Sequence, residues 1–194
     1  MSVATHVQEL REGAYLEASK RDILVSKLPR ITLTDIAFMP NDRPAKTQFR
    51  GKLKEGGGTA VFFQPLAWRR NETPRLLSIY EELGRAVNIQ RFFGVFYDSS
   101  SESYYAVMED LEGGNHPSVS LKDALSTELI AKASRIQRLR LCYEIALAIT
   151  YLHSLNIIVK VISETSFYVK EIKGEFVPTL TNLEYARLVP HSPY

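Results

Sequence analysis

Short runs of apolar residues predict strands in the first half of the chain. β-Branched and aromatic residues gather in five short stretches, a composition that favours strands. These stretches are Ile31–Ile36, Thr47–Leu53, Ala60–Gln64, Arg91–Tyr97 and Tyr104–Met108. Helical spacing instead predicts a helix at Val3–Leu28, which Pro29 ends, and another at Arg75–Leu83, which follows the helix breaker Pro74.

Helical spacing of apolar residues becomes dominant after residue 115. A short helix is predicted at Ser120–Leu125 and a long one at Ile136–Ser154. Apolar residues surround most of the long helix, so we expect it to be buried on several sides, with Cys142 as a small buried side chain. A final hairpin is predicted from Phe167–Ile172 and Phe176–Leu180.

This order of elements predicts an α+β protein with two lobes, preceded by an N-terminal helical segment at residues 1–30. Most strands come before most helices instead of alternating with them, which is typical of an antiparallel sheet with segregated helices. The triple glycine at 56–58 suits a hairpin connection between two strands. It does not indicate a phosphate-binding loop, because no Gly-Lys-Ser/Thr follows it.

Composition and charge place few limits on function. The chain has 194 residues, of which 45% are hydrophobic and 24% charged, as in an ordinary globular protein. A formal charge of +2 is too small to favour a nucleic acid as partner. No apolar run has the length of a membrane span, the N-terminus does not resemble a signal peptide, and a single cysteine fits a reducing compartment. We therefore expect a cytosolic or nuclear protein without a transmembrane segment, with the cytoplasm as the predicted location.

The stretch Tyr151–Ile158, which leads into Val159-Lys160-Val161, carries the clearest chemical signal. Together with the helix before it, this stretch resembles the approach to the catalytic loop of eukaryotic protein kinases. An active kinase would continue with His-Arg-Asp and place an Asn later in the same loop. Here Val161 stands at the Asp position and Ser166 at the Asn position. Valine cannot accept a proton, and serine is a poor replacement for a magnesium-binding amide.

Other segments resemble the same family in the same order. Asn88–Val95 is similar to the fourth strand and the turn before it, and Tyr105–Gly114 is similar to the fifth strand, gatekeeper and hinge. Ser120–Leu125 and Arg138–Ser154 resemble the two helices before the catalytic loop. The resemblance extends from Ile31 to the C-terminus and is strongest for the tyrosine-kinase-like branch.

The resemblance also assigns the residues of a nucleotide cleft. Met108 takes the gatekeeper position, and the hinge beside an adenine is formed by Glu109, Asp110 and Leu111. Phe62 replaces the small residue above the adenine and fills part of its pocket. Any residual nucleotide cleft is expected to be lined by these residues.

The charged groups that phosphoryl transfer needs are missing at the corresponding positions. Catalysis of this reaction depends on cations and metal ions that neutralise the phosphates. Gln64 stands where the third-strand lysine is expected, and Asn182, Leu183 and Glu184 stand where Asp-Phe-Gly is expected. The helix that should supply a glutamate has no carboxylate in register. No glycine occurs in 43–48, the segment that faces the phosphates.

The resemblance therefore implies a pseudokinase, a kinase-shaped module that binds another protein in signalling, such as an active kinase or an effector domain. It implies a kinase-like small lobe at 31–108, with about five antiparallel strands and a helix, and a partial helical large lobe at 109–194. We expect no enzyme activity and no cofactor. The cleft lacks the charges that hold ATP, and the metal positions lack the carboxylates that magnesium prefers.

Two other functions stay open from the sequence. An atypical active kinase would transfer phosphate from ATP to Ser, Thr or Tyr, and an ATP-binding switch would bind the nucleotide without turnover. A phosphotransfer assay decides the first, and a melting-temperature scan with ATP decides the second.

A further expectation concerns the length of the match. The chain ends shortly after the Asp-Phe-Gly-like segment, whereas a complete kinase domain continues through further helices. Those helices normally cover the long helix at Ile136–Ser154, so we expect its apolar surface to be partly exposed. Two explanations stay open: the chain is a fragment or a truncated gene product, or this surface is covered by the N-terminal helix Val3–Leu28 or by a partner protein.

Overall fold

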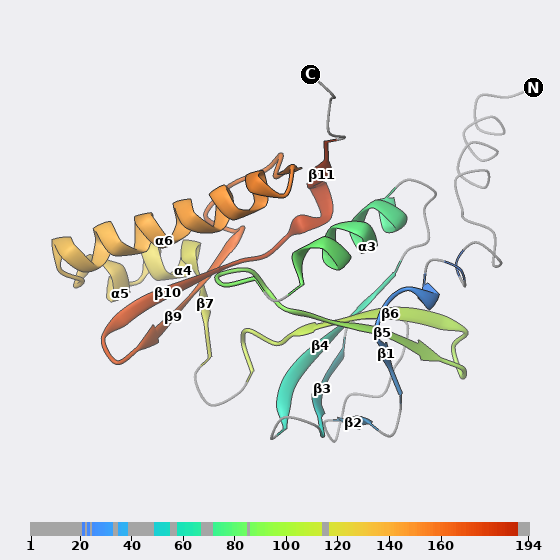
Figure 1. Ribbon diagram of the computed structural model, residues 1–194. Helices are drawn as coiled ribbons and strands as arrows, with labels where there is room; N and C mark the ends of the chain where they lie inside the picture. The colour runs from blue at the N-terminus through green and yellow to red at the C-terminus, as the bar shows by residue number, and fades with distance from the viewer. Residues whose placement is uncertain are drawn as a thin grey trace, which may run out of the picture.

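The computed structural model describes residues 21, 23, 25–32, 35–38, 49–54, 58–66, 72–84, 86–113 and 117–189. These residues form a mixed α+β fold with a curled six-stranded sheet, a three-stranded sheet and few helices (Figure 1). The α+β class predicted from the sequence is confirmed. Most of the predicted helix Val3–Leu28 and the whole of 43–48 lie outside the described residues. The described end of that helix is helical at 21, 23, 25 and 26 and stops before Pro29.

The larger sheet has six strands in the order β1-β5-β6-β4-β3-β2. Its strands are β1 Arg30–Ile31, β2 Ile36–Phe38, β3 Phe49–Leu53, β4 Thr59–Pro65, β5 Phe92–Asp98 and β6 Ser103–Glu109. β1 runs parallel to β5, and the other neighbouring pairs are antiparallel. The expectation of about five antiparallel strands is therefore wrong in the number of strands and in the direction of the first.

A turn at Asp35 splits the predicted strand Ile31–Ile36 in two. The Asp35 carboxylate accepts hydrogen bonds from the backbone N–H of Thr32 at 2.8 Å and from its hydroxyl at 2.6 Å. The Asp35 N–H in turn donates to the Thr32 carbonyl at 3.0 Å. Because this local bonding competes with an extended ladder, the residues before the turn pair with β5 and those after it pair with β3.

Helix α3, Glu72–Leu83, packs on one face of the larger sheet. It begins three residues before the predicted start at Arg75. Pro74 lies in the first turn, where a backbone N–H has no acceptor within the helix, so the proline does not break the helix. The Tyr80 ring stacks on the Phe92 ring of β5 with 4.7 Å between centroids. The buried side of α3 thereby forms one core cluster with residues of β5 and β6.

Aromatic side chains fill the opposite face of the larger sheet. Phe63 of β4 stacks on Phe49 of β3 at 4.3 Å and meets Phe96 of β5 edge-on at 5.7 Å. Tyr105 of β6 meets Phe49 edge-on at 5.0 Å. These rings belong to a second core cluster, separate from the one under α3. Alternate residues of β4 therefore serve different cores, as the period of a strand requires.

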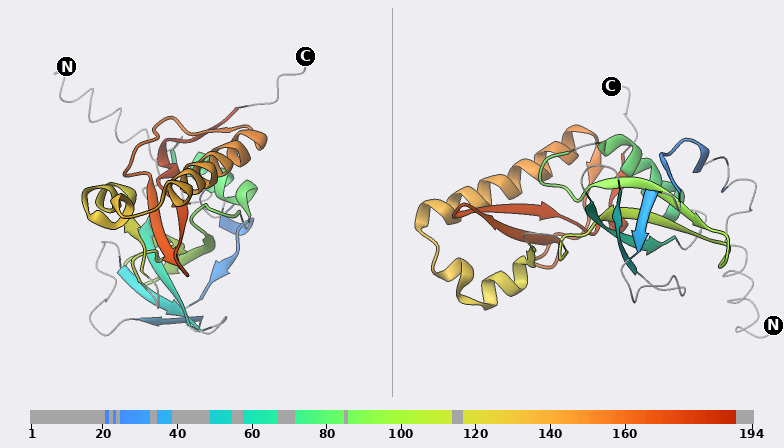
Figure 2. Two further views of the ribbon diagram at one scale, coloured as in Figure 1. Left: turned by 90° about the vertical axis from the view of Figure 1, so that its left-hand side faces the viewer. Right: turned by 90° about the horizontal axis from the view of Figure 1, so that it is seen from below.

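The three-stranded sheet, a two-stranded antiparallel sheet and a long helix with short helices make up the rest of the fold. The elements are β7 Val119–Ser120, α4 Leu121–Ser126, α5 Glu128–Ala131, α6 Arg135–Ser154, β8 Ile157–Ile158, β9 Phe167–Ile172, β10 Glu175–Leu180 and β11 Arg187–Leu188. β9 and β10 form the predicted hairpin, and β7 pairs with the other edge of β9. α6 lies along β10, and the short helices lie beside it (Figures 1 and 2).

α6 is less buried than expected. Only Leu141, Ala148 and Leu152 of its side chains are buried, whereas Cys142 is exposed. The expectations of burial on several sides and of a buried Cys142 are wrong, because the rest of the described chain covers one side of the helix. The expectation that the apolar surface of this helix is partly exposed is confirmed. None of the helices in the described part of the chain combines the length and apolar character that a membrane crossing requires.

Candidate functional site

A cleft of about 330 Å³ is lined by residues of both sheets. Its walls come from β3, β4, α3, the segment before β5, the end of β6 with the segment after it, β9 and the segment after β10. The residues singled out in the sequence that line it are Phe62, Gln64, Glu109, Asp110, Leu111, Asn182, Leu183 and Glu184. The fold thus gathers at one cavity residues that are widely separated along the chain.

The other predicted residues lie around the cleft instead of in its wall. Met108 is buried in the core cluster that includes α3. Val159 is also buried, whereas Lys160 is exposed and lines a neighbouring hollow of about 410 Å³. Val161 is 51% exposed, and Ser166 is buried. Of the sequence Val159-Lys160-Val161, the lysine therefore lines the neighbouring hollow, and none of the three lines the cleft itself.

A hydrogen bond joins two walls of the cleft. The side-chain amide of Gln64, on β4, donates to Glu184 Oε1 at 2.6 Å. Arg75 of α3 donates to the backbone carbonyl of Glu184. Glu184 lies in the 3-10 turn Leu183–Tyr185, so the carboxylate beside Gln64 comes from the segment after β10 and not from α3. Sequence pattern alone did not predict this pair, because its members are 120 positions apart.

Ser166 and Asn182 hold the loop that follows β8. The Ser166 hydroxyl accepts from the Ser163 N–H at 3.2 Å and donates to the Val161 carbonyl at 3.4 Å. Asn182 has a φ of 57°, a left-handed conformation that asparagine tolerates, and its amide donates to the Thr165 carbonyl at 3.4 Å. The two side chains at the expected metal positions are therefore near the same loop and bond to its backbone.

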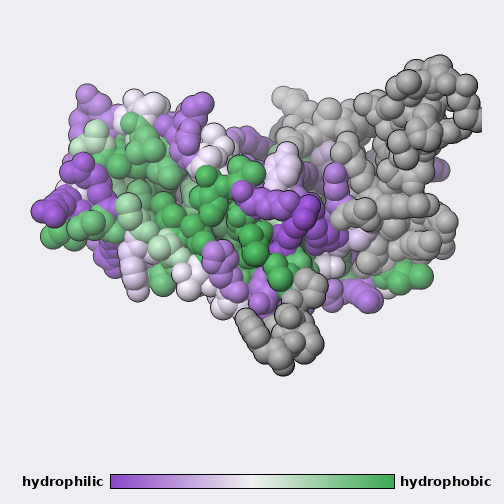
Figure 3. All heavy atoms as spheres, turned by 90° about the horizontal axis from the view of Figure 1, so that it is seen from above, coloured by the Kyte–Doolittle hydropathy of each residue, from purple (hydrophilic) through white to green (hydrophobic). Residues whose placement is uncertain are grey.

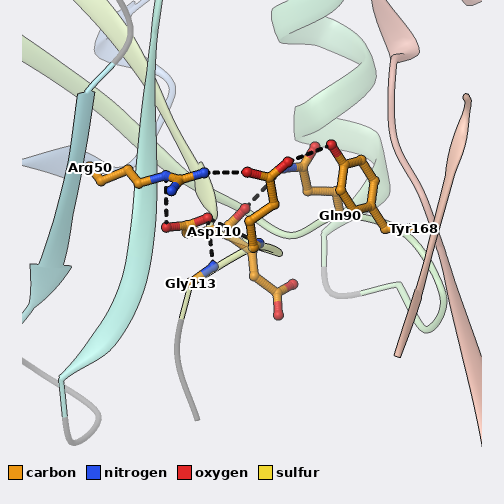
Figure 4. Close-up of polar contacts among 7 residues, drawn as sticks. Arg50, Gln90, Asp110, Gly113 and Tyr168 are labelled. Carbon is orange, nitrogen blue, oxygen red and sulfur yellow. Dashed lines mark hydrogen bonds and ion pairs between the residues drawn. The ribbon is translucent and has the colours of Figure 1, made fainter. Parts of the chain in front are cut away.

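A cluster of charged and hydroxyl groups spans the rim of the cleft (Figure 4). We call Arg50, Asp110, Glu112 and Tyr168 the Arg50 cluster. The guanidinium of Arg50, on β3, lies 3.3 Å from Asp110 Oδ2 and also pairs with Glu112 Oε2. The Tyr168 hydroxyl, on β9, donates to Glu112 Oε1 at 3.0 Å. The cluster therefore links the larger sheet, the segment after β6 and the smaller sheet.

Backbone groups hold the acidic part of the Arg50 cluster in place. Asp110 Oδ1 accepts from the N–H of Glu112 at 3.1 Å and from the N–H of Gly113 at 3.0 Å. The Asp110 side chain is only 6% exposed, so its charge is stabilised by these donors and by Arg50. The side-chain amide of Gln90 donates to the backbone carbonyl of Glu109, the residue before Asp110, at 2.9 Å.

The contacts of the Arg50 cluster shift the pKa values of Glu112 and Tyr168. The hydrogen bond from Tyr168, and then that from Arg50, lower the pKa of Glu112 despite some burial. Burial, and then the hydrogen bond to Glu112, raise the pKa of Tyr168. Both shifts favour the state in which Tyr168 donates to an ionised Glu112. This network could not be predicted from the sequence, because no motif links Arg50 to residues on two distant segments.

Replacing Glu112 by glutamine is expected to reduce the loss of stability on acidification. Because the pKa of Glu112 is lower in the folded protein than the ordinary 4.5, its stabilising contribution is complete above 4.5 and is lost as the pH falls through the lower folded value. The carboxylate is about half exposed, so we expect an effect of ~0.5 kcal/mol. Urea unfolding at a series of pH values from neutral to acid measures it.

Glu164→Gln, which removes an exposed carboxylate outside the Arg50 cluster, is the matched control. Tyr168→Phe removes one of the two partners of Glu112 and should give an intermediate pH dependence. If the wild-type protein and Glu112→Gln lost stability in parallel as the pH falls, the role given to this carboxylate would be wrong.

The charges around the cleft are mostly negative. Among the described lining residues, Arg50 is the cation, and the carboxylates are Glu109, Asp110, Glu112 and Glu184. Burial, and then the negative charge of Glu184, raise the pKa of Tyr80, so this phenol at the cleft stays protonated at neutral pH. No group of three or more His, Cys, Asp or Glu side chains suited to a metal ion occurs within the described ranges.

Comparison with known proteins adds no family assignment. No family model matches the chain, and its comparison with curated proteins finds no significant match. The chemistry of the cleft therefore rests on the side chains that line it.

Proposed function

We propose that the chain is a catalytically inactive protein kinase-like module, a pseudokinase, that acts by binding another protein. In this proposal a kinase-like small lobe at 31–108 precedes a partial large lobe at 109–194. The observation that carries it is the bond from Gln64 Nε2 to Glu184 Oε1 at 2.6 Å. At the position where the family has its phosphate-binding lysine, the chain has a neutral amide that is already bound to a carboxylate.

The electrostatics of the cleft support the same conclusion. A nucleotide triphosphate needs cations and bound metal ions that offset its charge. Arg50 is the cation among the described residues of the cleft, and it is already paired with Asp110 and Glu112. Ser166 and Asn182 bring no charge to the metal positions and bond to the loop after β8. Like charges at a few ångströms would oppose binding of a triphosphate here.

Exposed apolar side chains support a role in protein binding. Val161 is 51% exposed and Ile162 is 49% exposed, both in the loop after β8. Tyr185, in the turn that contains Glu184, is also exposed. Neighbouring exposed apolar groups are typical of binding surfaces. Such a surface suits a protein partner, for which an active kinase or an effector domain is our proposal.

The proposal predicts that the purified chain neither transfers phosphate nor responds to ATP. With labelled ATP and either magnesium or manganese, we expect no incorporation above background into the chain itself or into a generic basic protein. The melting temperature should not change with ATP, whereas binding at ~100 times the dissociation constant would add about 2.7 kcal/mol of stability.

A pair of variants separates intrinsic activity from a contaminating kinase. Transfer that Asn182→Ala abolishes and the exposed control Glu164→Ala retains would contradict the proposal and favour an atypical active kinase. A melting shift with ATP but without transfer would favour the alternative of a nucleotide-binding switch. Activity that neither variant changes would come from a contaminant and would leave the chain itself inactive.

A further inference from the structure

An exposed apolar stripe runs along the solvent side of α6. Leu139, Tyr143, Leu147 and Tyr151 recur every four residues and therefore lie on one side of the helix, and Ile136 lies at the start of the row. We call these five residues the α6 stripe. Their exposed fractions are 77% for Ile136, 60% for Leu139 and Tyr143, 42% for Leu147 and 38% for Tyr151. Figure 3 shows apolar side chains gathered on this side of the molecule.

The buried residues of α6 point the other way. Leu141, Ala148 and Leu152 pack into the two core clusters that α6 shares with the rest of the fold. α6 thus has two apolar sides, and the described part of the chain covers one of them. A contiguous exposed apolar surface of this kind is typical of a binding site.

A row of small side chains lies beside the α6 stripe. Cys142, Ala146 and Thr150 also recur every four residues, each directly before a large member of the stripe, and all three are exposed. A row of large side chains beside a row of small ones gives a ridge next to a groove, into which the ridge of another helix fits. A second copy of α6 has the same ridge and the same groove, so two copies complement each other around a two-fold axis.

The two ends of the α6 stripe carry opposite charges. Arg135 and Arg138 are exposed at one end. The other end adjoins the C-terminus of α3, because the Tyr151 hydroxyl donates to the carbonyl of the last residue of α3 at 3.4 Å. Glu81 and Glu82 are exposed there. An antiparallel pair of α6 helices sets the basic end of each copy beside the acidic end of the other, whereas a parallel pair sets like charges together.

We propose that the α6 stripe is a homodimer interface, in which two copies of the chain pack α6 against α6 in antiparallel orientation. In this arrangement Leu139 of each copy meets Tyr151 of the other, and Tyr143 meets Leu147. Self-pairing covers the apolar side that the described part of the chain leaves exposed. It does not depend on the proposed function, because a chain that transferred phosphate could pair in the same way.

Sedimentation velocity of the full chain tests the interface. Over concentrations from ~1 to ~100 μM we expect a concentration-dependent dimer of the wild-type protein. Leu147→Lys should raise its dissociation constant at least ~tenfold, because it places a charge in the centre of the contact. Leu125→Lys, which alters an exposed leucine on α4 outside the α6 stripe, should leave it unchanged. Circular dichroism and melting temperatures establish that both variants fold.

A charge exchange tests the antiparallel orientation. Arg138→Glu and Glu82→Arg should each weaken the dimer by ~3–10-fold, and the double variant, which exchanges the two signs, should restore it. Alkylation of the exposed Cys142 should slow as the dimer forms. The proposal is overturned by a wild-type chain that stays monomeric, by a Leu147→Lys variant that associates like the wild type, or by a double variant no better than the single ones.

Discussion

Replacing Phe63 by alanine is expected to lower the free energy of unfolding by about 3–5 kcal/mol. The Phe63 ring is fully buried at the centre of the larger sheet. It stacks on Phe49 at 4.3 Å and meets Phe96 at 5.7 Å, so its removal leaves a cavity between three strands. Alanine loses both the transfer free energy of the ring and its aromatic contacts. Chemical denaturation, read by circular dichroism, measures the change.

Phe62→Ala is the matched control for this prediction. Phe62 is the neighbouring residue on β4, but its side chain is only partly buried and borders the cleft. We therefore expect a loss well below that of Phe63→Ala, with the sheet intact. Equal losses for the two variants would contradict the assignment of alternate β4 residues to a closed core and an open cleft.

Leu152→Ala is expected to lower the free energy of unfolding by about 2–5 kcal/mol. Leu152 is fully buried in the core cluster that joins α6 to α3 and to the segment after β8. Truncation leaves a void at a place where both helices and the paired strands meet, and surrounding elements can only partly close it.

Leu147→Ala provides the comparison on the same helix. Leu147 belongs to the α6 stripe and is exposed, so we expect a change within ~0.5 kcal/mol when the protein is dilute and monomeric. Measured at high protein concentration, the same variant should lose more, because a dimer interface adds stability by mass action. A large loss at every concentration would mean that Leu147 is covered within its own chain.

The regular elements of the fold could be predicted from the sequence wherever one periodicity dominates. β5, β6, α6 and the hairpin of β9 and β10 all occur within a few residues of their predicted bounds. The strand expected at Ile31–Ile36 could not be predicted correctly, because a bond between Thr32 and the Asp35 carboxylate outweighs the β-branched residues around it. The prediction that α6 is buried on several sides was wrong for another reason. Periodicity shows that one side of a helix is apolar, but it does not show that another element covers that side.

Some residues of the candidate site could likewise be predicted from the sequence, and others could not. Gln64, Asp110 and Glu184 were singled out in the sequence, and all three line the cleft. Arg50 and Tyr168 were missed, although they close its rim together with Glu112. These contacts depend on how β3 and β9 are placed relative to the segment after β6, which no local pattern of residues records. The family roles of the predicted residues stay predictions, because geometry alone does not test them.

The parallel pairing of β1 has a consequence for how partners can attach to the larger sheet. The N–H of Val95 bonds to the Pro29 carbonyl at 2.9 Å, and β1 pairs with the middle of β5 at Val95 and Phe96. Gly94 allows this close approach, since a Cβ there would clash with the Pro29 carbonyl. Pro29 itself has no N–H to offer. The edge of the larger sheet at β1 is therefore short and offers few backbone N–H and C=O groups to an incoming strand, which disfavours edge-to-edge aggregation.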